Sequence, residues 1–278
     1  MRPAVELDVF YGEEPVGTLY DSTPLAFEYS SAWLRRASRM AVAAIPLTAG
    51  RNDSAAVQAF FENLLPEGEL RQYLAQQNKA STLFSLLREV AGDTAGGFVI
   101  MPGGQAPRAP TYEATSWEAL AGLLGRKSAS AIDIKGRGAR ISLAGAQDKA
   151  VIAIFDDGVP RLPRETAPST HILKPDIKRL SKVRHSAANE AIIMLTAAKC
   201  GLPTAEVFYE PHTQACVVRR FDRMARADGT LERHTTLFRA SHRRSGSGSR
   251  QDESRLNRRL TTPQSKSIKT LVRTSSGR

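Results

Sequence analysis

The sequence predicts an α+β fold in two parts, followed by a disordered basic tail. The first part alternates short strand patterns with amphipathic helices. The second part is mostly of strand character, with a hairpin signal near its start. Apolar residues then become scarce, and Ser and Arg dominate the end of the chain. These observations divide the 278 residues into an N-terminal domain at 1–104 and a linker with one helix at 105–140. A mostly β part at 141–236 and the tail at 237–278 follow.

The N-terminal domain begins with strand patterns at residues 7–11, 15–20 and 26–29, the first two joined by a turn at Gly12. Gly96 and Gly97 lead into a further apolar strand at 98–101. Between these strands, apolar residues at helical spacing predict three helices: one from a cap at Asp53 or Ser54 to Pro66, one around Leu70, Tyr73 and Leu74, and one from Ser81 or Thr82 through Val90.

A Gly/Pro-rich stretch at 102–110 predicts a linker, and Thr115 with Glu118 predicts a capping box for the helix that follows. The basic stretch 126–140 predicts a loop. A hairpin around Asp157-Gly158 then opens the second part. Its remaining elements are a strand at 170–174, a helix from a cap at Ser186 to Cys200, and strands at 206–209 and 215–220.

The stretch 142–149, Ser-Leu-Ala-Gly-Ala-Gln-Asp-Lys, precedes the strand at 150–155. Its small residues would let backbone N–H groups approach phosphate oxygens, and Lys174 at the end of a later strand would add a point charge. The structural alternative is an ordinary loop before a strand, with Lys174 as a solvated strand end. We interpret the stretch 142–149 and Lys174 as a phosphate-binding site.

Three blocks, at 142–149, 170–174 and 218–223, together resemble the HipA family of serine/threonine kinase toxins from bacterial toxin–antitoxin pairs. The stretches 31–34, 60–66 and 86–93 carry the same resemblance, which covers residues 1 to about 236. It implies a kinase-like N-lobe in the second part, with ATP and Mg²⁺ as cofactors. It also implies a HipB-like antitoxin that carries the DNA contact, a protein substrate of the translation apparatus, a role in persistence, and a cytoplasmic location without membrane contact.

The resemblance also assigns site residues. Ser142 matches a position that family members phosphorylate on themselves, and Glu190 either pairs with Lys174 or is a glutamate favoured at a helix N-terminus. Residues 219–221 resemble the hinge that receives adenine, although the family often has Glu where Arg219 stands. The alternative is that residues 220–223 are a charge-paired strand end. The nucleotide-binding residues implied are Ala144, Gly145, Ala146, Gln147, Asp148, Lys149, Lys174, Arg219, Arg220 and Phe221.

A kinase also needs a catalytic aspartate and metal ligands. The family carries them in an Asp-Gly-His-x-Lys-Asn motif, but Asp157-Gly158 is followed by Val159 and Asp228-Gly229 by Thr230. We therefore expect no catalytic residue, no metal ligand and no helical C-lobe in these 278 residues, and hence an inactive chain. The alternatives are a non-enzymatic module that binds the antitoxin, or a nucleic-acid binder that uses the basic tail.

The tail at 237–278 holds eleven Lys and Arg but only two acidic residues, Asp252 and Glu253, and so carries +9 of the chain's net charge of +11. Such a segment buries too little apolar surface to offset its ordering entropy. It is either a native disordered tail or the product of a shifted reading frame, and we favour the latter because a neighbouring frame can encode a family-like continuation. Cys200 and Cys216 are too few for a disulfide framework or a thiolate zinc site.

Overall fold

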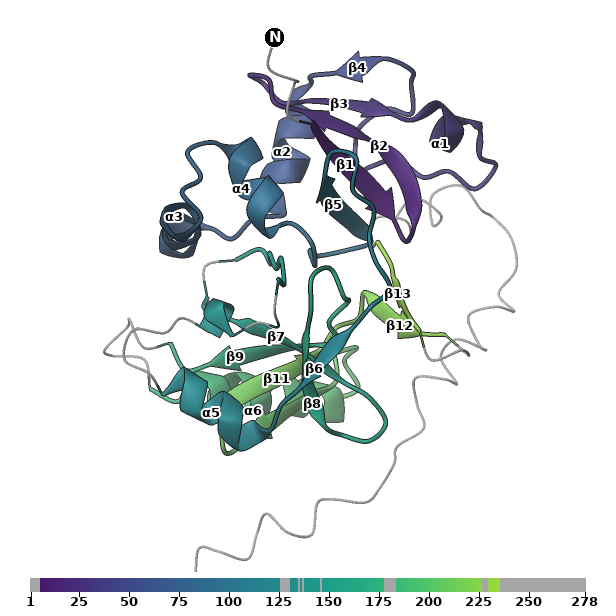
Figure 1. Cartoon of the computed structure of the whole chain (residues 1–278). Helices are drawn as coiled ribbons and strands as arrows, with labels where there is room; N and C mark the ends of the chain where they lie inside the picture. The colour runs from purple at the N-terminus through teal and green to yellow at the C-terminus, as the bar shows by residue number, and fades with distance from the viewer. Residues whose placement is uncertain are drawn as a thin grey trace, which may run out of the picture. The chain divides into compact units, whose positions relative to one another are not determined.

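The computed structural model describes residues 6–125, 131–134, 136, 138–145, 147–177, 184–226 and 230–235 (Figure 1). All of them belong to one contact unit, Met1–Leu237. The predicted tail at 237–278 lies outside the described residues. So do Ala146 of the predicted nucleotide-binding loop and the dipeptide Asp228-Gly229.

The first sheet is antiparallel, with the strand order β4-β3-β2-β1-β5. The turn between β1 and β2 contains Gly12 at φ +62°, a backbone conformation that favours glycine. The predictions at 7–11, 15–20, 26–29 and 98–101 are confirmed, and the short β4 was not predicted. The strands are β1 Glu6–Tyr11, β2 Glu14–Tyr20, β3 Ala26–Tyr29, β4 Arg51–Asn52 and β5 Phe98–Pro102.

The helices of the first part are α1 Ser31–Arg35, α2 Ala55–Asn63, α3 Gly68–Gln77 and α4 Leu83–Val90. The last three confirm the predicted helices, whereas α1, with five residues, was not predicted. Thr82 caps α4, because its side chain accepts from the backbone N–H of Ser85 while the Ser85 side chain accepts from the N–H of Thr82.

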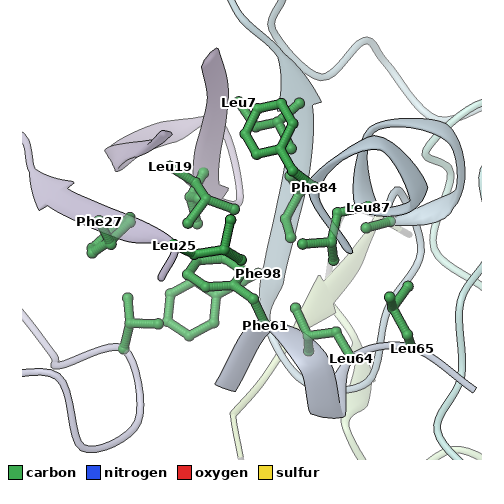
Figure 2. Close-up of a cluster of buried hydrophobic side chains, with 14 of the residues drawn as sticks. Leu7, Leu19, Leu25, Phe27, Phe61, Leu64, Leu65, Phe84, Leu87 and Phe98 are labelled. Atoms are coloured by element: carbon green, nitrogen blue, oxygen red, sulfur yellow. The ribbon is translucent and has the colours of Figure 1, made fainter. Parts of the chain in front are cut away.

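The first apolar core lies between this sheet and α2, α3 and α4. Leu7 on β1 and Phe98 on β5 meet Phe61, Phe84 and Leu87 from the helices (Figure 2). Alternation along the strands places Phe10, Val99 and Met101 in a separate small cluster. Full burial of each large apolar side chain contributes about 1.5–3 kcal/mol.

The second sheet is also antiparallel, with the order β10-β11-β9-β7-β8-β6. The predicted hairpin is confirmed: Gly158, at φ +71°, donates its N–H to the carbonyl of Phe155. The strands are β6 Tyr112–Ala114, β7 Ala150–Ile154, β8 Pro160–Pro163, β9 His171–Pro175, β10 Val207–Glu210 and β11 Ala215–Arg219. The strand β6 was not predicted.

Two predicted helix caps are wrong. For α5, Trp117–Leu124, the cap is Ser116, whose side chain accepts from the N–H of Ala119. For α6, Ser186–Lys199, Ser186 is the first helical residue and His185 is the cap position. The carboxylate of Asp176 takes over the capping role, because it accepts from the N–H of Ala187 at 2.8 Å.

The second core joins α5 to the sheet through Leu120, Leu124, Ile152 and Leu173. The stretch 126–140, expected to be a loop, contains the short 3₁₀ helix η1 Ala131–Asp133 where it is described. A small hairpin of β12 Arg223–Ala225 and β13 Leu231–Arg233 follows β11. The sequence analysis did not identify these two strands.

Candidate nucleotide-binding site

Lys174 and Glu190 form an ion pair between β9 and α6. The Lys174 Nζ lies 2.6 Å from Glu190 Oε1, and both side chains are only partly exposed. The two residues are held by separate elements: Lys174 by the ladder of β9 with β11, and Glu190 by α6, which Asp176 caps. Of the two roles weighed for Glu190, the structure places it in the pair with Lys174.

Lys149 is buried beneath the small-residue loop. Its Nζ donates to the carbonyls of Ala144 at 3.2 Å and Gly145 at 3.3 Å, so the loop folds back over the ammonium group. Gly145 has φ +98°, a left-handed conformation in which a side chain would be strained. The loop shape therefore depends on glycine at this position.

Burial, followed by the positive charge of Lys174, lowers the pKa of Lys149 from its ordinary value. The positive charges of Lys149 and Lys174 therefore repel each other. Of the side chains of Lys149, Lys174 and Glu190, only that of Glu190 is negative. Two ammonium groups beside a loop of small residues provide the cationic surroundings that an anionic group such as a phosphate requires.

Asp148 points elsewhere. Its carboxylate accepts from the N–H of Ala131 at 2.6 Å and of Ile132 at 3.2 Å, at the start of η1. Gln147 is partly buried, and Ala146 lies outside the described residues. Of the predicted loop residues, the structure thus brings Ala144, Gly145 and Lys149 together and gives Asp148 a structural contact.

Ser142 is fully buried at the start of the loop. Its Oγ donates to the carbonyl of Leu64 at 2.6 Å, and its N–H donates to the carbonyl of Asp93 at 3.2 Å. The nearby Arg140 donates to the carbonyls of Leu87, Arg88 and Ile100, so its guanidinium caps the end of α4. A kinase can reach the Ser142 hydroxyl only after this segment leaves its place.

The three predicted hinge residues lie in different surroundings. Arg219 is exposed and pairs with Glu206 at 2.8 Å, and Phe221 has 73% of its surface exposed. Arg220 is buried, and its guanidinium binds Asp93 and Asp222. The N–H groups of Arg219 and Arg220 already donate to protein carbonyls. Adenine contacts from these residues stay a prediction.

The structure shows the charge pairing at 220–223 that the sequence left open as an alternative, because Asp222 pairs with Arg220 and Arg223. The sequence analysis missed the more distant neighbours of this cluster, which are Asp93, Ser169 and Arg233. A sequence signal for this cluster was available in the stretches at 86–93 and 218–223. They contain Asp93, Asp222 and Arg223, which have no part in the predicted nucleotide site. No local sequence pattern predicts that these charged side chains are buried and paired with each other.

Within the described ranges, no group of three or more His, Cys, Asp or Glu side chains is placed to hold a metal ion. The part of the chain that the structure describes also contains no helix with the length and apolar character needed to cross a membrane. The described cationic groups of Lys149 and Lys174 suit an anionic ligand such as phosphate.

Comparison with known protein families matches residues 7–101 to the HipA N-terminal domain and residues 141–275 to the HipA-like C-terminal domain. The second match extends into the segment at 237–278, whose reading frame stays a prediction. The chain belongs to the HipA family.

Two curated relatives are similar over most of this chain. A putative kinase, Y4mE of Sinorhizobium fredii, is 33% identical over 222 residues, which cover 75% of this chain and 51% of that protein. The serine/threonine-protein kinase toxin HipA of Shewanella oneidensis is 29% identical over 226 residues, 78% of this chain and 50% of that one. The chain spans about half the length of these relatives.

A solved structure gives the same result for the fold. The complex of HipA, HipB and operator DNA from Shewanella oneidensis contains a chain that is 25% identical to this one, with a TM-score of 0.63. The similarity covers 82% of this chain and 54% of that chain. The mixed α and β fold is therefore that of a HipA structure.

Proposed function

We propose that this chain carries the phosphate-binding part of a HipA-like serine/threonine protein kinase toxin. The observation that carries the proposal is the 2.6 Å pair between Lys174 on β9 and Glu190 on α6. In kinases a strand lysine paired with a helix glutamate is the arrangement that positions ATP phosphates. Lys149 and the loop at 144–149 supply the second cation and the close backbone approach.

The role of each group follows from its chemistry. Lys174 offers a point charge to phosphate oxygens, and Glu190 fixes where that charge lies. Lys149 Nζ donates to the loop carbonyls of Ala144 and Gly145 and adds positive charge next to Lys174. In a complete kinase, ATP bound in this way would supply the γ-phosphoryl group for transfer to a protein hydroxyl. The Mg²⁺ that the family implies stays a prediction, and no described residue is assigned to it.

The test is calorimetric titration of the purified chain with ATP. Lys174→Met is expected to weaken binding at least tenfold, because it removes the charge and leaves Glu190 without its partner. The matched control is Lys199→Met at the exposed end of α6, which is expected to bind as the unchanged chain does. Equal affinities for the unchanged chain and Lys174→Met would contradict the proposal.

The proposal stops at nucleotide binding for these 278 residues. The Asp-Gly-His-x-Lys-Asn motif is not found in their sequence, and phosphoryl transfer requires its aspartate. We expect no labelled phosphate on Ser142, or on proteins of the translation apparatus, after incubation with γ-labelled ATP. Transfer by the purified chain would refute this part of the proposal.

A second role is binding of a HipB-like antitoxin, with DNA contacted through the antitoxin. It is supported by the similarity over 82% of this chain to HipA in a complex with HipB and operator DNA. This role needs no catalytic aspartate. Co-expression with an antitoxin encoded beside this gene is expected to yield a complex, and Lys174→Met is expected to leave that complex intact.

A further inference from the structure

The stretch at 86–93 resembles the family but has no part in the nucleotide role proposed above. It ends in Asp93, which follows α4 and is 1% exposed. Oδ2 of Asp93 accepts from the N–H of Ser169 at 3.1 Å and from its Oγ at 2.6 Å. Its two oxygens also bind Arg220 and Arg223, at 3.3 and 2.8 Å.

The Asp93 carboxylate is charged although it is buried. Burial opposes its ionisation, but Arg220, Arg223 and Arg233 outweigh that cost and hold the pKa of Asp93 well below its usual value. Arg220 is shared with the carboxylate of Asp222, at 2.8 Å. A buried charge of this kind is tolerated only while its partners keep their places.

The backbone of Asp93 holds the start of the loop. Its carbonyl accepts from the N–H of Ser142, its N–H donates to the carbonyl of Arg140 at 2.7 Å, and it forms a parallel bridge with Ile141. Gly92 permits this approach, because a Cβ there would lie 2.7 Å from the carbonyl oxygen of Arg140.

Asp93 therefore contacts two of the three blocks of the sequence signature and a residue next to the third. Ser142 opens the loop block, and Arg220 and Arg223 belong to the last block. Ser169 lies one residue before the block 170–174 that carries Lys174. These segments are far apart in sequence, and a residue of the N-terminal domain contacts each of them.

We propose that Asp93 is a positioning residue that holds the loop, the Lys174 strand and the 219–223 segment in one arrangement. The inference rests on the proposed nucleotide site, whose parts these segments are. Asp93 need not touch the nucleotide, because it acts through Ser142, Ser169 and Arg220. Loss of one contact is coupled to the others, since Asp93 cannot leave Ser142 without also disturbing its buried ion pairs.

The experiment is hydrogen exchange, read by mass spectrometry, on the whole chain without nucleotide. Asp93→Asn is expected to raise exchange at least tenfold in 140–149, 169–174 and 219–223 and to leave residues 14–29 unchanged. The matched control is Asp157→Asn, which removes an aspartate that pairs with Arg161 on an exposed hairpin. It is expected to change none of these segments.

An increase in hydrogen exchange that is confined to the residues next to Asp93 would overturn the inference. So would an equal increase in residues 14–29. If Asp93→Asn does not fold, Ser169→Ala decides, because it removes the bond from Ser169 Oγ to Asp93 Oδ2 and keeps the ion pairs of Asp93 with Arg220 and Arg223. It is expected to raise exchange in 169–174 and also in 140–149. No change in 140–149 would show that the segments are independent.

The outcome is separate from that of the nucleotide proposal. Hydrogen exchange without nucleotide reports the coupling whether or not ATP binds. Titration with ATP then reports whether the positioned segments form a nucleotide site, and Asp93→Asn is expected to weaken ATP binding at least fivefold. A chain with coupled segments and no affinity for ATP would refute the proposed function alone.

Discussion

The first apolar core and the Asp93 cluster are both buried, but they are held together by different physics. In the core, Phe61, Phe84 and Leu87 fill space between sheet and helices, and their attraction is not directional. Around Asp93, burial opposes ionisation, and only specific arginine partners offset it. The apolar core therefore stabilises the first part, whereas the charged cluster fixes the position of one segment against another.

The largest expected effect comes from breaking the cluster. Asp93→Asn leaves Arg220, Arg223 and Arg233 with one carboxylate, that of Asp222, and is expected to lower the free energy of unfolding by about 3–5 kcal/mol. Leu87→Met in the apolar core changes shape at nearly constant volume and should cost less than about 1.5 kcal/mol. Urea denaturation of the two variants measures the difference. Equal losses of unfolding free energy in the two variants would show that the charged cluster and the apolar core do not differ in this way.

The second prediction concerns pH. Burial, followed by the charge of Arg219, lowers the pKa of His171 to about 4. The unfolded chain therefore binds the proton first as pH falls below about 6.5, so stability is full above that value and is lost progressively down to about pH 4. The loss reaches roughly 3 kcal/mol at most. His171→Gln should lack this dependence in thermal unfolding followed between pH 7 and pH 4.

A smaller effect is expected at the loop. Gly145→Ala places a side chain at φ +98° and should cost about 1–2 kcal/mol in local strain. The substitution strains the residue whose carbonyl accepts from Lys149. We therefore expect the free energy of ATP binding to change more than the free energy of unfolding. The control is Gly122→Ala, where the helix α5 leaves open space for a Cβ. Equal ATP affinities in the two variants would show that the loop shape does not matter.

The smallest effect is expected at the surface. Arg219 and Glu206 form an exposed pair, and exposed pairs are worth at most about 1 kcal/mol. Arg219→Ala should therefore change the urea midpoint little, in contrast to changes at the neighbouring buried Arg220. A loss as large as that of Asp93→Asn would mean that Arg219 belongs to the cluster after all.

The sequence predicted most elements of regular structure because their signals are local. Strand alternation placed β1, β2 and β3, helical spacing placed α2 and α4, and Asp157-Gly158 placed a hairpin. Its errors were also local. The caps of α5 and α6 were assigned to Thr115 and Ser186, whereas Ser116 and Asp176 supply the bonds. A cap is decided by which side chain reaches the first free N–H groups, and neighbouring polar residues compete for that role.

The family, the loop of small residues and the prediction for Lys174 follow from residue type and spacing. The pairing of Glu190 with Lys174, the contact of Asp148 with the start of η1 and the burial of Ser142 depend on how distant segments pack. The same packing brings Asp93 to Arg220 across 127 residues of sequence. Such contacts are set by packing of distant segments, because a buried charge finds its partner in space and leaves no periodic trace along the chain.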